Sequence, residues 1–168
     1  MFGKQHRTLL KTKNTKPIPS KQGTLKTNKL EPGDLIFSDQ FESRLRGRVF
    51  GHRGSYLFSQ KYRGGTLFCD AASGFIFAKS QSTLTAMETI KSKVLFERQA
   101  LSAGVQIKTY CTDNGIYTSK NFLKEISVQK QGIRLSGVDG HHQNGVAENG
   151  IKHIVRSSRT MMIHTALR

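Results

Sequence analysis

Residues 105–138 read VQIKTYCTDNGIYTSKNFLKEISVQKQGIRLSGV, and this stretch decides the class of fold. It begins with an apolar run that predicts a strand ending at Asp113. Ser119 can cap a short helix that runs to Lys130, and IRLSGV predicts a second strand. A strand, a helix and another strand in such close succession are typical of a sheet with helices packed on it.

Further elements precede this stretch. GDLIFSDQF, residues 33–41, predicts a buried strand that ends at Asp39. GGTLFCDAASGFIFAKS, residues 64–80, has two apolar segments around a DAASG turn, which is a hairpin pattern. Thr83 can cap a helix that runs to about Ala103. The apolar positions of that helix include Ala86, Ile90, Val94 and Leu101.

A final helix is expected from about Val146 to Thr165, after the polar loop DGHHQNG. The order of elements is then strand, hairpin, helix, strand, helix, strand, helix. We therefore predict an α/β fold, a mixed five-stranded sheet with flanking helices. A chain of 168 residues has room for one domain of ordinary size.

The chain is strongly basic, with 27 Lys and Arg against 11 Asp and Glu and a formal net charge of +16. Such a charge calls for an anionic partner. Nucleic acid is the leading candidate, because neutralised phosphates release their counterions and this favours binding. No apolar stretch approaches the roughly 18 residues of a membrane helix, and the N-terminus lacks a signal-peptide pattern. We expect an intracellular protein with no membrane partner.

Two segments concentrate the positive charge. Residues 1–30 hold eight Lys or Arg and no acid, which predicts an extended basic arm or linker, with a solvated tail as the alternative. Residues 44–63 hold six Lys or Arg and no acid, and we interpret them as a strand-connecting insertion or hairpin. Its aromatic residues can stack on nucleic-acid bases or pack the insertion onto the domain, and both interpretations stay open. These aromatic residues are Phe50, Tyr56, Phe58 and Tyr62.

Three acidic residues stand in positions suited to a metal site. Asp39 and Asp113 end predicted strands, where α/β sheets commonly place ligand sites, and Glu148 lies in the first turn of the last helix. Carboxylates of this kind can hold Mg²⁺, and their mutual repulsion is costly unless cations neutralise it. Complementing the helix dipole is the alternative for Glu148, and serving the turn is the alternative for Asp113. Asp70 and Asp139 also lie at strand ends or turns and are not excluded.

The cysteines and paired histidines carry weaker signals. Cys69 and Cys111 lie in predicted core strands outside any CxxC pattern, so we interpret them as reduced packing residues. His141 and His142 are adjacent, which is a poor arrangement for chelation, and no cysteine is close. We interpret them, with the two residues that follow, as a polar loop over the active site or as plain loop residues.

From about Pro32 to its C-terminus, the chain resembles the catalytic core of a copia-type LTR retrotransposon integrase. The resemblance rests on GDLIFSD, FCDAASGFI, YCTDNGIYTSKNF and IRLSGVDGHHQNGVAENGIKHIVRSSRTMM, and most specifically on TDNG and HHQNGVAE. It implies an RNase H-like fold and a DDE site. Asp39, Asp113 and Glu148 would be the catalytic residues and the ligands of two Mg²⁺ or Mn²⁺ ions.

The resemblance also implies an activity, namely 3′-end processing and DNA strand transfer without a covalent protein intermediate. The implied partners are element-end DNA and target DNA, and integrases generally act as homo-oligomers. The implied location is the nucleus, with a cytoplasmic particle before entry. A catalytically inactive DNA-binding remnant of a decayed element is the alternative from another class, and an RNase H-like nuclease is a further enzymatic one.

The last helix is expected to contact DNA. Lys152 and Arg159 lie four and eleven positions beyond Glu148 and share roughly its face, with a solvated basic face as the alternative. The residues predicted to contact DNA are Lys152, Arg156, Arg159, Asn144 and Gln143. The residues of the helix predicted to face the core are Ile151, Ile154, Val155 and Met162.

The resemblance bears on the extent of the chain as well. In relatives, FGKQHR follows a zinc-binding domain, and the chain continues past the helix with the catalytic Glu. We therefore expect residues 1–30 to be an arm after a missing zinc-binding domain, and residues 31–168 to be a C-terminally truncated core. Relatives usually place Arg after that Glu, whereas Asn149 and Gly150 follow it here. Glycine there weakens the helix by roughly 1 kcal/mol relative to alanine.

Overall fold

The computed structural model describes residues 30–47, 61–136 and 144–166. Within these ranges no helix is long and apolar enough to cross a membrane. Several sequence predictions fall on other residues and therefore lie outside the described part of the chain. They concern the basic arm, Phe50, Tyr56, Phe58, Asp139, His141, His142 and Gln143.

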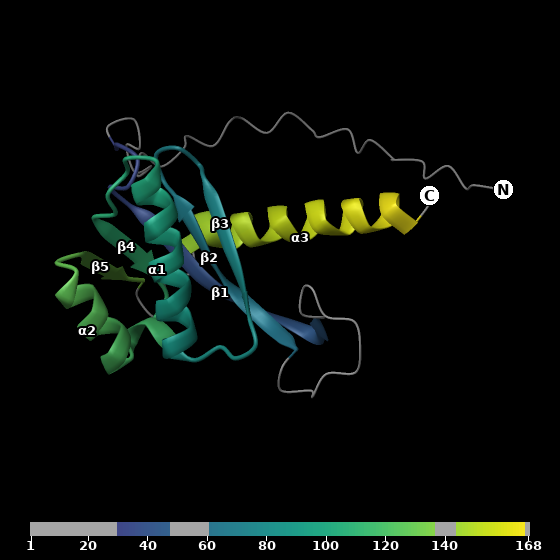
Figure 1. Ribbon diagram of the computed structural model, residues 1–168, viewed down its shortest axis with the longest axis horizontal. Helices are drawn as coiled ribbons and strands as arrows, with labels where there is room; N and C mark the ends of the chain where they lie inside the picture. The colour runs from purple at the N-terminus through teal and green to yellow at the C-terminus, as the bar shows by residue number, and fades with distance from the viewer. Residues whose placement is uncertain (1–29, 48–60, 137–143, 167–168) are drawn as a thin grey trace, which may run out of the picture.

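Five strands form one mixed sheet in the order β3-β2-β1-β4-β5 (Figure 1). Antiparallel pairing joins β1 to β2 and β2 to β3, whereas β4 runs parallel to both β1 and β5. The strands are β1 (Ile36–Gly47), β2 (Tyr62–Asp70), β3 (Ile76–Gln81), β4 (Thr109–Thr112) and β5 (Gly132–Leu135). The predicted α/β fold with a mixed five-stranded sheet is confirmed.

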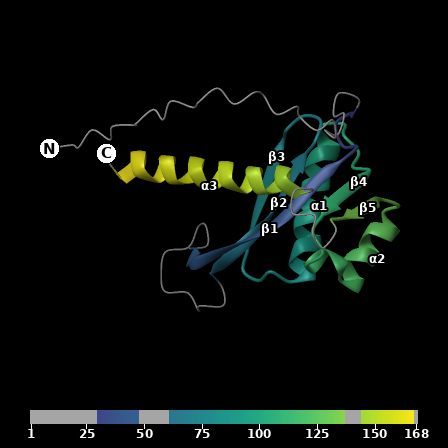
Figure 2. The same cartoon turned by 180° about the vertical axis from the view of Figure 1, so that it is seen from behind.

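The helices cover both faces of this sheet. The α-helices are α1 (Ala86–Ser102), α2 (Lys120–Val128) and α3 (Gly145–Ala166), and a 3₁₀ turn, η3, spans Ile116–Thr118. α1 and α2 pack on one face and α3 crosses the other, extending well past the sheet (Figures 1 and 2). Ser119 caps α2 as predicted, but Thr85 rather than Thr83 caps α1. Thr85 takes this place because its side chain accepts the N–H of Glu88.

Strands β1 and β2 serve both faces because successive side chains point to opposite sides of a strand. On one side Phe68 stacks on Phe96 of α1, with ring centroids 4.9 Å apart, and Ile36 joins the same cluster. On the other side Leu67 packs in the cluster that contains Ala147 of α3. This two-sided burial explains the continuous apolar runs of the sequence.

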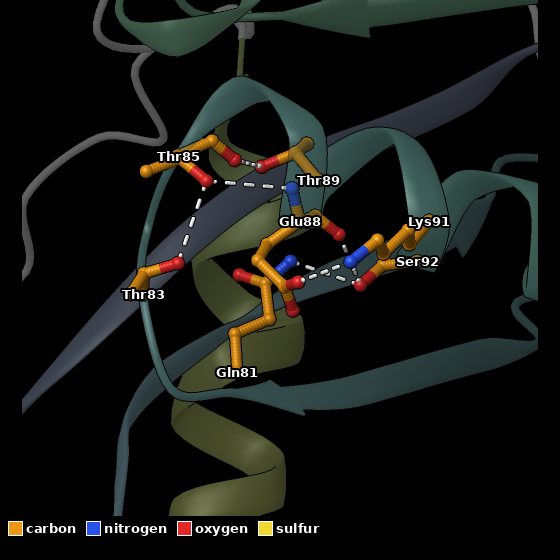
Figure 3. A network of polar contacts seen from close by, with 7 residues as sticks. All are labelled: Gln81, Thr83, Thr85, Glu88, Thr89, Lys91 and Ser92. Atoms are coloured by element: carbon orange, nitrogen blue, oxygen red, sulfur yellow. Dashed lines mark hydrogen bonds and ion pairs between the residues drawn. The ribbon is translucent and has the colours of Figure 1, made fainter. Parts of the chain in front are cut away.

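The first half of α1 is held to the sheet by polar contacts. Gln81 at the end of β3 donates to the Ser92 hydroxyl at 2.9 Å (Figure 3). Gln40 of β1 donates to the Thr89 hydroxyl at 2.7 Å. By contrast Val94 and Leu101, apolar positions of the predicted helix, are exposed. Ile90, another predicted apolar position, does pack against the core, so hydrophobic periodicity identified only part of the inner face of this helix.

The middle of α1 carries a buried ion pair. The side chain of Lys93 is fully buried, and its ammonium lies 2.9 Å from the Glu97 carboxylate. Glu97 also accepts the Tyr110 hydroxyl of β4 at 2.7 Å and the Gln131 amide at 2.5 Å. The pair thus links α1 to β4 and to the turn before β5. A buried charge of this kind depends on its partner.

Candidate active site

Asp39 and Asp113 lie side by side where two parallel strands stop pairing. The β1–β4 ladder ends with Ser38 opposite Thr112, so each aspartate is the next residue on its strand. The prediction that Asp39 ends a strand is wrong, because β1 continues to Gly47. It continues because β2 still supplies an antiparallel partner beyond the point where β4 ends. The prediction for Asp113 agrees with the end of β4 at Thr112.

Helix α3 brings Glu148 to the same place. It packs against β1 and β2, and Glu148 lies in its first turn. The pKa of the Asp39 carboxyl is raised to about 6. Burial is the largest cause, the charges of Asp113 and Glu148 also raise this pKa, and an N–H from Gln40 at 2.8 Å lowers it. Because both charges act on Asp39, the three carboxylates lie within electrostatic reach of one another.

The donors of this acidic trio (Asp39, Asp113 and Glu148) suit a hard divalent cation, because carboxylate oxygens are the ligands that Mg²⁺ prefers. None of the three forms an ion pair with another described residue. A bound cation would therefore reduce the repulsion among the three carboxylates. Across the described ranges, however, no three His, Cys, Asp or Glu side chains are arranged to hold a metal ion as they stand. The carboxylates of the trio are suitable ligands for a cation, but in this structure they are not arranged closely enough to coordinate one together.

Asp70, the other described candidate, serves a turn instead. Its carboxylate accepts the backbone N–H of Gly33 at 2.9 Å and the N–H of Ser73 at 2.7 Å. The Ser73 hydroxyl donates to it as well, at 2.5 Å. With both oxygens engaged and the residue buried, Asp70 stabilises the β2–β3 turn and is a poor candidate for a ligand.

The predicted DNA contacts on α3 divide into two groups. Lys152, Arg156 and Arg159 are exposed, and their helical spacing keeps them near the face of Glu148. Asn144 is buried, and its Nδ2 donates to the backbone carbonyl of Ser38 at 3.2 Å. The prediction that Asn144 contacts DNA does not fit this position, because the side chain is buried and donates a hydrogen bond inside the protein.

The apolar side of α3 also departs partly from prediction. Ile151 and Ile154 pack against the sheet as expected, but Val155 and Met162 are exposed. Met162 lies in the C-terminal part of α3, and this helix extends past the sheet (Figure 2).

Gly150 has a packing role that the sequence did not reveal. A Cβ added there would lie 3.2 Å from the Leu67 side chain of β2, closer than most real contacts of this kind. Glycine therefore lets the first turns of α3 approach the sheet closely. Glycine lowers the stability of the helix itself, but a larger residue at this position would crowd Leu67.

Ser38 and Tyr117 are site residues that sequence reasoning missed. Both are buried, and their hydroxyls lie 2.9 Å apart, with Ser38 next to Asp39 in the chain. Burial raises the pKa of Tyr117 far above its ordinary value, so the hydroxyl stays protonated. The one available signal was a polar residue, Ser38, within an otherwise apolar run.

The cysteines fit their predicted packing role. Cys69 is buried and Cys111 is half-buried, and the two form no disulfide with each other. Burial raises the pKa of each thiol, which keeps it in the unreactive protonated form.

No protein-family model and no curated protein matches the chain. Solved structures do. The HTLV-2 integrase catalytic core domain in complex with magnesium matches in its dimeric form with a TM-score of 0.58 and 18% identity, over 80% of this chain and 76% of that one. The fold is that of an integrase catalytic core. The trimeric form matches with a TM-score of 0.51, again at 18% identity, over 77% of this chain and 73% of that one.

A larger assembly with the same core fold also matches. It is the simian T-cell lymphotropic virus intasome in complex with PP2A regulatory subunit B56 gamma. The TM-score is 0.54 at 18% identity, over 70% of this chain, which spans 37% of that longer protein. At such identities the likeness shows the integrase-core fold and leaves the activity to be argued from the site.

Proposed function

We propose that the protein is the catalytic core of a copia-type retrotransposon integrase, a polynucleotidyl transferase that processes the 3′ ends of element DNA and joins them to target DNA. The observation that carries the proposal is that the charges of Asp113 and Glu148 act on Asp39, at the point where β1 and β4 stop pairing, on a fold shared with integrase cores. The resemblance of the TDNG and HHQNGVAE motifs supports the narrower family.

The acidic trio would hold two Mg²⁺ or Mn²⁺ ions. When bound, such ions supply an activated attacking oxygen and a stabilised leaving oxygen in phosphodiester transfer. Asp39 must lose its proton to serve as a ligand, so cation binding should strengthen as the pH rises through the pKa of about 6. The HTLV-2 core was solved with magnesium, which supports this choice of ion.

The proposed partners are the DNA ends of the element and its target DNA, which points to action in the nucleus. The exposed basic residues of α3 share the face of the helix that bears Glu148, so phosphates held there would lie close to the acidic trio. Structural relatives form dimers, trimers and an intasome, which supports a homo-oligomer.

The deciding experiment measures strand transfer by the purified protein with an oligonucleotide that carries the element's ends. We expect joined products in Mg²⁺ or Mn²⁺ and none in EDTA. Asp113→Asn should abolish them, since it removes a proposed ligand and keeps the size of the side chain. Wild-type protein with no more product than Asp113→Asn would refute the transferase assignment.

A DNA-binding remnant is the second candidate, because the described acidic groups form no ready-made metal site while α3 keeps its basic face. This candidate predicts DNA binding that weakens with salt, with no cleavage or joining in any divalent cation. Strand transfer by the wild-type protein would exclude it.

The α3 face can be tested through the salt dependence of binding. We expect Lys152→Gln, Arg156→Gln and Arg159→Gln together to lower the slope of log affinity against log salt concentration by about 2 to 3, roughly one per lost phosphate contact. The measurement is fluorescence anisotropy with labelled duplex DNA over a range of salt concentrations.

A control variant removes the same charge elsewhere. The residues are Arg98 on α1 with Lys120 and Lys124 on α2, all exposed. Changing these three to Gln should leave the slope near the wild-type value, because they lie on the opposite face of the sheet. Equal slopes for the two triple variants would mean that binding follows total charge rather than the α3 face.

A further inference from the structure

Ser38 contacts the segments that carry the two other acids of the trio. Its hydroxyl lies 2.9 Å from that of Tyr117, which belongs to the 3₁₀ turn just after Asp113. Its backbone carbonyl accepts Nδ2 of Asn144 at 3.2 Å, and Asn144 immediately precedes the helix that bears Glu148. Ser38 itself is the residue before Asp39. We refer to Ser38, Tyr117 and Asn144 as the Ser38 junction.

The junction is shielded from water. Ser38, Tyr117 and Asn144 are 0%, 1% and 4% exposed, so its hydrogen bonds do not exchange freely with solvent. Breaking one leaves a buried polar group unpaired, which is costly. Within the described residues Oδ1 of Asn144 has no partner, so there this side chain is held by the hydrogen bond from Nδ2 to the Ser38 carbonyl.

Repulsion between the carboxylates pushes their three segments apart, and the junction opposes that separation. We infer that the Ser38 junction keeps the three segments of the acidic trio close together and so favours divalent-cation binding, with Asn144 as the positioning residue for Glu148. This inference rests on the proposed function, because it assigns the trio to cation binding. It gives Asn144 a role that requires neither contact with DNA nor contact with the cation.

The test measures Mn²⁺ binding by isothermal titration calorimetry and, separately, the melting temperature in EDTA. We expect Asn144→Ala to weaken Mn²⁺ binding by about 10- to 100-fold, the range typical for groups that orient metal ligands. Asn149→Ala is the matched control, because Asn149 is exposed and adjacent to Glu148, and it should bind as the wild type does. A merely structural role would lower the melting temperature but leave the Mn²⁺ affinity of the folded protein unchanged.

Tyr117→Phe provides a second variant should Asn144→Ala fail to fold. It keeps the ring in the core and removes only the hydroxyl that meets Ser38, and we expect weaker Mn²⁺ binding here too. Wild-type affinity in the folded variants would overturn the inference while leaving the proposed function intact. If the wild type binds no Mn²⁺, or if the Asp113→Asn variant binds Mn²⁺ as tightly as the wild type does, the inference and the proposed function are both overturned.

Discussion

Asp39→Asn is expected to abolish cation-dependent DNA processing and, in cation-free protein, to raise the melting temperature. Groups that merely orient metal ligands account for 10- to 100-fold in affinity or activity, so loss of a ligand should cost more than about 100-fold. The gain in stability has a separate cause. Asp39 is partly buried beside the charges of Asp113 and Glu148, and an uncharged amide removes both the desolvation and the repulsion.

The gain in stability from Asp39→Asn should increase with pH. The pKa of Asp39 is about 6 in the folded protein against an ordinary value of 3.8, so between these values the native state holds the proton more tightly than the unfolded state. Wild-type stability therefore falls as the pH rises through this window. The advantage of Asp39→Asn should be absent near pH 4 and complete above about pH 6. Thermal unfolding in EDTA across this range measures it.

Asp34 offers a control, because its pKa is shifted in the opposite direction from that of Asp39. Its hydrogen bond with Lys108, at 2.7 Å, lowers the pKa of the Asp34 carboxyl, so Asp34→Asn should give no gain above pH 6. If Asp39→Asn stabilises no more than Asp34→Asn, the three carboxylates do not repel one another in solution. Added Mn²⁺ should raise the melting temperature of the wild type and leave Asp39→Asn almost unaffected.

Glu97→Ala is expected to destabilise the protein by about 3–5 kcal/mol, the usual cost of breaking a buried ion pair from one side. The variant leaves the fully buried ammonium of Lys93 without its partner. It also removes the acceptor for the Tyr110 hydroxyl and for the Gln131 amide. Such a loss is a large part of the 5–15 kcal/mol that ordinarily stabilises a domain. Equilibrium unfolding in urea measures it.

An exposed pair on the same helix gives the comparison. Lys91 and Glu88 also lie 2.9 Å apart, but the lysine side chain is 68% exposed, so Glu88→Ala should cost at most about 1 kcal/mol. Combining Lys93→Met with Glu97→Gln removes both buried charges and should recover much of the loss. Equal effects of Glu97→Ala and Glu88→Ala would mean that the Lys93 pair is open to water.

Much of the fold could be predicted because its signals are local. Apolar runs bounded by turn residues identified the five strands, and Ser119, the first residue of SKNFLKEISVQK, identified the cap of α2. The cap of α1 was misplaced by two residues, since Thr83 and Thr85 are equally able to accept an N–H. The inner face of α1 was misjudged because Thr89, Ser92 and Lys93 are buried with polar partners, which periodicity of apolar residues does not register.

The sequence by itself determined the order of elements and indicated the three acids as candidates, because both depend on residue type, short-range pattern and recognisable motifs. Only the tertiary structure decided what surrounds those acids. Asn144 lies 106 positions from Ser38 along the chain, and their contact exists because α3 crosses the sheet where β1 and β4 stop pairing. Burial of a polar side chain depends on such long-range packing, so an asparagine in a polar loop resembled a DNA contact until its neighbours were known.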